Sequence, residues 1–113
     1  MNLLVTGGCG FIGSNFIDMI LKDEKQTVSK VVNVDSLTYA GNVENTRTFN
    51  LDQRYFFENI DLRSFSCVFD VFKKHNITHV VHLAAESHVD NSISSPDIFI
   101  ETNIVGTFNL LKA

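Results

Sequence analysis

The sequence has no tryptophan, one proline and two cysteines among its 113 residues. Cys9 and Cys67 lack the spacing of metal ligands, and in a chain without a secretory signal they are expected to be free thiols. There is no uninterrupted apolar run of about 18 residues, so no membrane-spanning helix is expected. The start of the chain also lacks the basic region and apolar stretch of a secretory signal, which favours a cytoplasmic location.

Positive charge is scarce as well. Nine lysines and arginines stand against 13 aspartates and glutamates, giving a formal net charge of −4, and no basic cluster occurs. This balance argues against a nucleic-acid-binding protein. What is present is an ordinary globular composition, 44% hydrophobic and 19% charged, in a length that suits one modest domain. We therefore expect residues 1–113 to belong to a single folded domain.

Four short apolar runs predict β-strands, at residues 2–6, 30–35, 54–60 and 79–85. Apolar residues at helical spacing predict three helices between and after them. The first helix has a predicted apolar face at Ile12, Phe16, Met19 and Ile20, the second at Phe65, Val68, Phe69 and Phe72, and the third at Ile100, Ile104, Phe108 and Leu111. Residues 36–54 are polar and are expected to form mostly loop, with one short helix.

This alternation predicts an α/β fold in which the strands form a doubly wound parallel sheet. Right-handed crossovers give the strand order 3-2-1-4 and leave the fourth strand at an edge. Four strands supply only about the first half of such a sheet. The last helix runs to Ala113 without a residue that would end it. We therefore expect this chain to be the front part of a longer protein, or its sheet edge to be covered by another chain.

Three glycines, Gly7, Gly10 and Gly13, fall in the predicted turn between the first strand and the first helix. A helix N-terminus presents unpaired N–H groups and a partial positive charge. Glycines at this spacing permit a tight turn, the approach of a pyrophosphate and close packing of the helix on the strand. The turn therefore predicts a dinucleotide-binding site, although glycines also serve plain turns.

Asp35 lies at the end of the second predicted strand, 22 residues after Gly13. A carboxylate there can accept hydrogen bonds from both hydroxyls of an adenosine ribose. It also repels a 2′-phosphate, at a cost of roughly 4 kcal/mol for two charges about 4 Å apart in an effective dielectric of about 20. Asp35 therefore favours NAD over NADP, unless it only caps the loop that follows.

Four segments give the chain a family resemblance: TGGCGFIGSN, VDSLTYAGN, HLAAESHVDNSI and TNIVGT. They resemble the extended short-chain dehydrogenase/reductases and, within them, the nucleotide-sugar 4,6-dehydratases, most closely the branch that acts on dTDP-glucose in the deoxysugar (rhamnose) pathway. The resemblance implies a Rossmann-type sheet, of which this chain holds the first half, and a substrate domain that lies outside it. It covers essentially the whole chain. One departure is Asn91, where the family commonly has arginine.

The resemblance implies NAD as cofactor, a nucleotide sugar as substrate and a homodimer in the complete enzyme, paired through helices of this region and beyond. Ser87 would reach the hexose. The residues implied to bind NAD are Gly7, Gly10, Phe11, Ile12, Gly13, Asp35, Ser36, Leu37, Thr38, Asp61, Leu62, Leu83, Ala84, Ala85, Glu86 and Thr102. Glu86 is equally well interpreted as a solvated or capping acid.

The family's chemistry also needs a Tyr-x-x-x-Lys pair and acid and base carboxyl groups. Tyr39 and Tyr55 are followed four residues later by valine and asparagine, so no catalytic residue is assigned and these 113 residues alone are expected to be inactive. A nucleotide-sugar epimerase or decarboxylase, or a non-catalytic dinucleotide-binding module, remain alternatives. Ser87, His88 and Asp90 are too close in sequence for a hydrolase triad, and His79 and His82 are expected to be structural.

Overall fold

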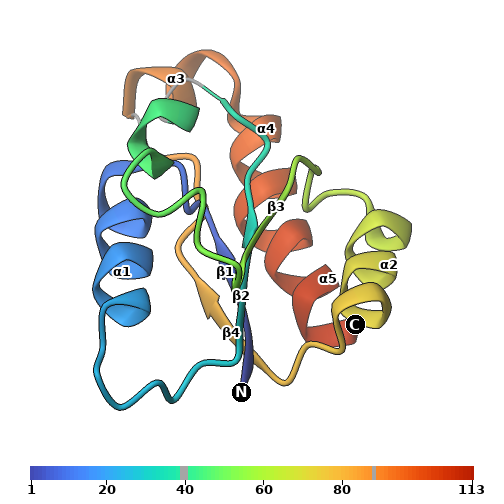
Figure 1. Ribbon diagram of the computed structural model, residues 1–113. Helices are drawn as coiled ribbons and strands as arrows, with labels where there is room; N and C mark the ends of the chain where they lie inside the picture. The colour runs from blue at the N-terminus through green and yellow to red at the C-terminus, as the bar shows by residue number, and fades with distance from the viewer. Residues whose placement is uncertain (39–40, 88) are drawn as a thin grey trace.

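The computed structural model describes residues 1–38, 41–87 and 89–113 (Figure 1). Four parallel strands form one sheet in the order β3-β2-β1-β4, which confirms the predicted topology. Their bounds are β1 Asn2–Thr6, β2 Lys30–Val34, β3 Tyr55–Glu58 and β4 His79–His82. Leu4 pairs with Val32 on one side and with Val80 on the other, so β1 and β2 lie at the centre and β4 at an edge.

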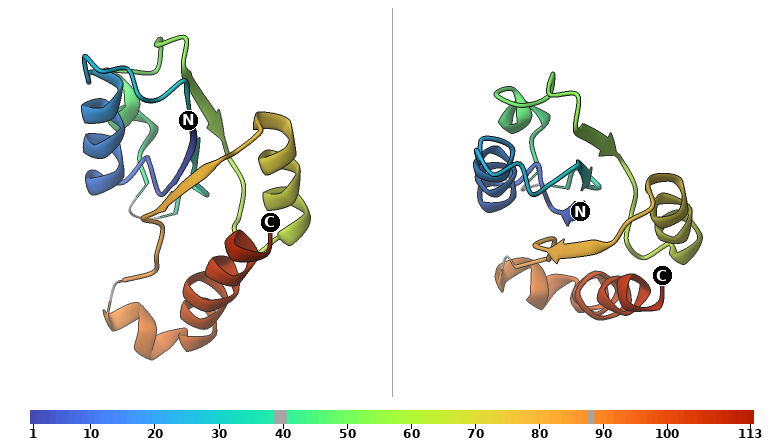
Figure 2. Two further views of the ribbon diagram at one scale, coloured as in Figure 1. Left: turned by 90° about the horizontal axis from the view of Figure 1, so that it is seen from below. Right: turned by 60° about the horizontal axis from the view of Figure 1, so that its bottom comes forward.

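Helices cover both faces of this sheet, as a doubly wound fold requires (Figures 1 and 2). Helix α1 (Phe11–Leu21) lies on one face, and α2 (Phe65–His75) and α5 (Gly106–Lys112) lie on the other. The shorter elements are η1 (Val43–Thr46), α3 (Val89–Ser94), α4 (Pro96–Ile100) and a π-helical turn, η2 (Glu101–Val105). Alternate residues of β1 enter two separate cores, Leu3 and Val5 with α1, and Leu4 with α2 and α5.

The predicted apolar face of α1 is only partly buried, since Phe16 and Ile20 pack against the core but Ile12 and Met19 do not. Ile12 and Met19 are 69% and 61% exposed, whereas Ile17 and Leu21 are buried together with Gly13. Gly13 fixes this rotation, because it lies so close to the preceding turn that a Cβ there would be 2.2 Å from the carbonyl oxygen of Gly7. Residues four and eight positions further along the helix then face the sheet.

The last predicted helix differs from the prediction in two ways. It is divided into α4, the wider turn η2 and α5, and its predicted apolar face points to solvent. Ile100, Ile104, Phe108 and Leu111 are 53%, 58%, 59% and 83% exposed. The buried residues are instead Gly106, Asn109 and Leu110, because the Asn109 side chain donates to the Leu62 carbonyl at 2.8 Å and holds that face of α5 inward.

Helix α2 follows its predicted pattern more closely. Val68 is buried, Phe72 packs against the same core, and Phe65 and Phe69 are half-buried and stack on each other with ring centroids 5.7 Å apart. The helix ends on His75, which is buried and whose Nε2 lies 2.7 Å from Oε1 of Glu58 on β3. Lys74 donates to the same oxygen at 2.6 Å. This ion-pair cluster joins α2 to the outer strand of the sheet.

Glu58→Gln is expected to lower the free energy of unfolding by about 2 kcal/mol at neutral pH, because a hydrogen-bonded carboxylate is lost. Burial raises the pKa of Glu58, but the hydrogen bonds from His75 and Lys74 outweigh it and hold the pKa below its ordinary value of 4.5. A lowered pKa stabilises the fold above that ordinary value, and this contribution is lost as the pH falls through the folded pKa. Urea unfolding of both proteins between about pH 6 and about pH 3 should show the difference disappear. Glu24→Gln, at an exposed position, serves as the control and should show no such dependence.

Candidate functional site

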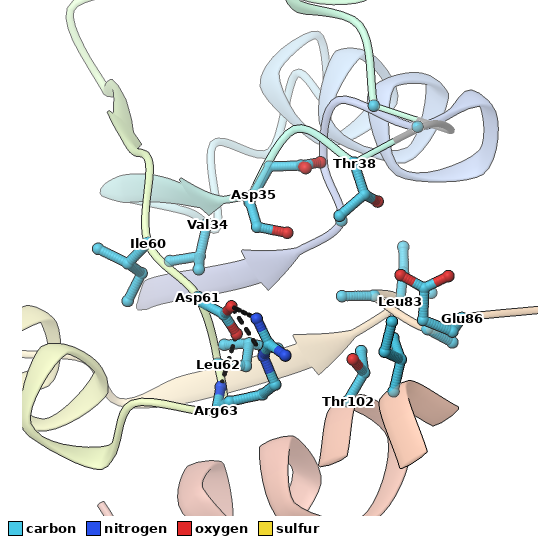
Figure 3. Close-up of a pocket in the computed structure, with 17 residues that line it drawn as sticks. Val34, Asp35, Thr38, Ile60, Asp61, Leu62, Arg63, Leu83, Glu86 and Thr102 are labelled. Atoms are coloured by element: carbon cyan, nitrogen blue, oxygen red, sulfur yellow. Dashed lines mark hydrogen bonds and ion pairs between the residues drawn. The ribbon is translucent and has the colours of Figure 1, made fainter. Parts of the chain in front are cut away.

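A pocket of about 290 Å³ lies beyond the carboxyl ends of all four strands (Figure 3). In open α/β sheets ligands bind at this edge, where the order of the strands reverses. The predicted site residues that line the pocket are Gly7, Gly10, Asp35, Ser36, Thr38, Asp61, Leu62, Leu83, Ala84, Ala85, Glu86 and Thr102. The fold therefore brings together side chains from four strand ends and one helical turn.

The glycine turn forms one end of the pocket. Gly7 has φ +71°, a left-handed conformation that glycine adopts without strain, and a Cβ there would be 2.8 Å from the backbone nitrogen of Ala84. Gly10 has φ −77° and an extended backbone that any residue can adopt. What glycine provides at position 10 is therefore the missing side chain beside the pocket, and not an unusual backbone conformation.

Helix α1 begins at Phe11 immediately after this turn, and no side chain caps it. The first N–H groups of such a helix have no partner within the helix and present positive partial charge. The side chains of Phe11 and Ile12 point away into solvent, 81% and 69% exposed, so only their backbone faces the turn. This arrangement suits the binding of an anion by backbone N–H groups.

Asp35 follows β2 and is buried, with only 8% of its surface exposed. Its Oδ2 accepts the N–H of Cys9 at 2.9 Å and its Oδ1 accepts the N–H of Leu37 at 2.8 Å. The first bond ties Asp35 to the glycine turn, and the second holds Leu37 at φ +57°. Because each carboxylate oxygen can accept two hydrogen bonds, both oxygens keep capacity for a pair of ligand hydroxyls.

Asp61 follows β3 and is fixed by the neighbouring Arg63. Oδ2 accepts from Nε of Arg63 at 2.8 Å and from Nη2 at 2.6 Å, while Oδ1 accepts the backbone N–H of Arg63 at 2.9 Å. These bonds hold the pKa of Asp61 below its usual range, so it is ionised at neutral pH. Arg63 also reaches Glu101 on the turn η2 at 3.1 Å and so joins two walls of the pocket.

The opposite wall is the segment after β4. Ala84 is packed against Gly7, and the backbone of Glu86 is held by Asn103 of η2. The N–H of Glu86 donates to Oδ1 of Asn103 at 2.9 Å, and Nδ2 of Asn103 donates to the Glu86 carbonyl, also at 2.9 Å. The neighbouring residue of the same turn, Thr102, faces the pocket (Figure 3).

Several predicted site residues do not line the pocket. Phe11, Ile12, Gly13 and Leu37 belong to the turns beside it, and Ser87 is exposed and follows the lining residue Glu86. Tyr39 and Ala40 of the VDSLTYAGN segment, and His88 of the rejected triad, lie outside the described residues. Sequence reasoning missed the lining residues Val34, Gly41, Ile60, Arg63 and Ile98.

Both cysteines are free thiols, as predicted. Burial raises the pKa of Cys9 to about 11, since an ionised sulfur would lose its water, so this residue of the glycine turn is an inert packing group. Among residues 1–38, 41–87 and 89–113, no group of three or more His, Cys, Asp and Glu side chains is placed to hold a metal ion. In the same residues no helix has the length and apolar character needed to cross a bilayer.

A family model described as GDP-mannose 4,6 dehydratase matches residues 4–113. The chain belongs to this family. The dTDP-glucose 4,6-dehydratase of Shigella flexneri is 50% identical over 113 residues, which are 100% of this chain and 30% of that enzyme. The dTDP-glucose 4,6-dehydratase of Neisseria meningitidis is 50% identical over 111 residues, which are 98% of this chain and again 30% of the relative. The chain thus spans about 30% of the length of these curated relatives.

Solved structures agree with this family assignment. DesIV, a dTDP-glucose 4,6-dehydratase from Streptomyces venezuelae described with NAD bound, superposes with a TM-score of 0.90 at 42% identity, over 99% of this chain and 35% of that one. A UDP-glucose 4-epimerase from Thermotoga maritima superposes with a TM-score of 0.83 at 35% identity, over 99% of this chain and 33% of that one. These two enzymes, a dehydratase and an epimerase, therefore share the four-stranded sheet and its connections with this chain.

Proposed function

We propose that this chain is the NAD-binding part of a dTDP-glucose 4,6-dehydratase and that residues 1–113 are the first part of its cofactor domain. The observation that carries the proposal is the pairing of an uncapped helix behind a glycine turn with a buried carboxylate at the end of the next strand. These two features suit the pyrophosphate and the adenosine ribose of NAD. The 50% identity to relatives named dTDP-glucose 4,6-dehydratase supports the choice of substrate.

The pocket has groups suited to each part of NAD. The backbone N–H groups of Phe11 and Ile12 would meet the pyrophosphate, and Asp35 would accept the two ribose hydroxyls, with Ser36, Leu37 and Thr38 beside them. Asp61 and Leu62 would flank the adenine. Leu83, Ala84, Ala85, Glu86 and Thr102 would lie along the nicotinamide side, where the small side chains of the two alanines leave the ring room beside the strand end. Ser87, exposed next to Glu86, would meet the hexose.

Bound NAD would supply the oxidant for C4 of the hexose and, once reduced, the hydride for C6 after loss of water across C5 and C6. The part that the described residues would play is to bind NAD and to orient it in the pocket. Asp61 remains ionised next to Arg63, and Asp35 remains anchored to the glycine turn, so both acceptors are fixed before a ligand arrives. Such preorganisation reduces the entropy lost on binding.

Mass spectrometry of the reaction tests this proposal directly. The protein at its natural length, loaded with NAD and given dTDP-glucose, is expected to form a product lighter by one water. A 4-epimerase, the runner-up because such enzymes share this fold, would leave the mass unchanged. If NAD binds but the mass of dTDP-glucose never changes and its stereochemistry is inverted at C4, the proposed function is wrong and the protein is an epimerase.

The apolar stripe Ile100, Ile104, Phe108 and Leu111 supports the proposal of a homodimer in the complete protein. Four apolar side chains along one exposed helical line are typical of a surface that another element covers. Phe108→Asp in the natural-length protein is expected to convert the dimer to a monomer in sedimentation experiments. Leu51→Asp, at an apolar residue that is 92% exposed, serves as the control and should remain dimeric. A Phe108→Asp protein that sediments as a dimer would mean that the chain's own continuation covers the stripe.

A further inference from the structure

A chain of hydrogen bonds runs from the end of β1 to the last helix through His82. Thr6 is fully buried, and its hydroxyl accepts the N–H groups of Leu83 at 3.0 Å and Ala84 at 3.1 Å. The same hydroxyl lies 2.6 Å from Nδ1 of His82. On the other side of the ring, Nε2 of His82 lies 3.0 Å from Oγ1 of Thr107. Oγ1 of Thr107 in turn donates to the carbonyl of Asn103 at 2.6 Å.

The direction of each bond follows from the number of protons available. A hydroxyl has one proton and two lone pairs. The hydroxyl oxygen of Thr6 accepts the N–H of Ala84 and the N–H of Leu83, which is shared with the Thr6 carbonyl oxygen at 3.2 Å. With both lone pairs engaged, the hydroxyl proton is directed to Nδ1 of His82. Nδ1 is then unprotonated, and the ring carries its proton on Nε2, which donates to Thr107. Burial lowers the pKa of His82, which agrees with a neutral ring.

This series of hydrogen bonds connects two groups that hold one wall of the pocket, the segment Leu83–Glu86. The segment Leu83–Glu86 is held at its start by Thr6 and at its end by Asn103, whose side chain bonds both the N–H and the carbonyl of Glu86. His82 and Thr107 are the link between these supports, because they join the Thr6 hydroxyl to the Asn103 carbonyl. Thr102, which faces the pocket, precedes Asn103 on the same π-helical turn. The wall is therefore tied to that turn twice, directly through Asn103 at its end and through Thr6, His82 and Thr107 at its start.

We propose that His82 is a positioning residue that, as the neutral ring with its proton on Nε2, sets the position of the wall Leu83–Glu86 against the turn carrying Thr102 and so the fit of the pocket around its ligand. That the ligand is NAD rests on the function proposed above. His82 touches neither ligand nor reacting atoms in this role. It acts through Thr6 and Thr107, which distinguishes it from the structural role expected from sequence alone.

The test uses variants of the natural-length protein. His82→Phe keeps a ring of similar size and removes the bonds of His82 to Thr6 and to Thr107. Thr107→Val keeps the bond to Thr6 and removes the bond to Thr107, together with the bond from Thr107 to the Asn103 carbonyl. Each is expected to weaken NAD binding about tenfold and to speed the hydrogen exchange of the Leu83, Ala84 and Glu86 amides in the absence of NAD. Thr107→Ser keeps the hydroxyl and should restore both properties. His79→Phe, at the exposed other end of the same strand, is the matched control and should change neither.

Two further measurements distinguish a positioning role of His82 from a simple packing role. In the double variant His82→Phe/Thr107→Val the loss of NAD affinity should equal that of one substitution, because each substitution already interrupts the same series of hydrogen bonds. Additive losses, or a Thr107→Ser protein as weak as Thr107→Val, overturn the proposal. If the unmodified protein binds no NAD, the proposed function fails, whereas unchanged amide exchange in both His82→Phe and Thr107→Val refutes the positioning role whatever the ligand is.

Discussion

Gly13→Ala is expected to destabilise the protein by about 3 kcal/mol or more. The added methyl group would lie 2.2 Å from the carbonyl oxygen of Gly7 and 2.8 Å from Cα of Gly8. These are backbone atoms, so no side-chain rotation relieves the clash, and α1 must move away from the turn. That movement also displaces the helix N-terminus from the pocket. We therefore expect both a lower melting temperature and a loss of NAD binding, measured by thermal unfolding and by titration.

Gly106→Ala is the matched control for this substitution. Gly106 also lies in a helix and is buried, but a Cβ there would meet only the Cβ of Leu62, at 3.2 Å, and no backbone atom closer than 3.8 Å. Alanine gains up to about 1 kcal/mol over glycine in a helix, which offsets the tight contact. The control should therefore change stability by less than about 1 kcal/mol. Equal losses in the two variants would contradict the role given to the turn at Gly13.

The topology of the sheet, and the places of the glycine turn and Asp35 at its edge, were predictable because they depend on local sequence. Short buried strands separated by helical patterns define a parallel sheet, and Asp35 could be located by its place at the end of such a strand. The rotation of α1 was not predictable from its apolar residues, since the close contact of Gly13 decides it. Apolar periodicity indicates which residues share a face, and it does not indicate whether that face is covered.

The same distinction explains the last helix. Ile100, Ile104, Phe108 and Leu111 do share a face, as predicted, but the described residues bury the opposite side through Asn109 and Leu110. The hydrogen-bonded supports of the pocket were also beyond sequence reasoning. Thr6 and His82 are separated by 76 positions, and Arg63 and Glu101 by 38, so no local spacing indicates that they meet.

Asp35→Asn is expected to shift the ratio of NAD to NADP affinity toward NADP by up to about a thousandfold. The carboxylate would lie beside the 2′-phosphate of NADP, and removing its charge removes the repulsion. The substitution should also weaken NAD binding. Asp35 accepts from two N–H donors, those of Cys9 and Leu37, one at each carboxylate oxygen, whereas the asparagine amide has only one oxygen that can accept. One donor would then face the amide NH₂ group, at a cost of about 1–3 kcal/mol.

The ratio of dissociation constants, and not either value alone, is therefore the measurement that tests the charge argument. Asp52→Asn is the matched control. Oδ1 of Asp52 accepts the N–H of Arg54 at 2.9 Å, the same bond to the second following residue that Asp35 makes with Leu37, but Asp52 lies outside the pocket lining. The control should leave the ratio unchanged. Equal ratios in Asp35→Asn and the unmodified protein would remove Asp35 from the ribose site.

Asp35→Glu separates the two roles of this residue. The longer side chain keeps the negative charge but cannot keep both short bonds to Cys9 and Leu37 from the same backbone position. If charge is what excludes NADP, Asp35→Glu should bind NAD more weakly and still reject NADP, whereas Asp35→Asn should bind NAD more weakly and accept NADP. If both variants accept NADP equally, the geometry of the loop after β2 selects the cofactor, and the electrostatic argument is wrong.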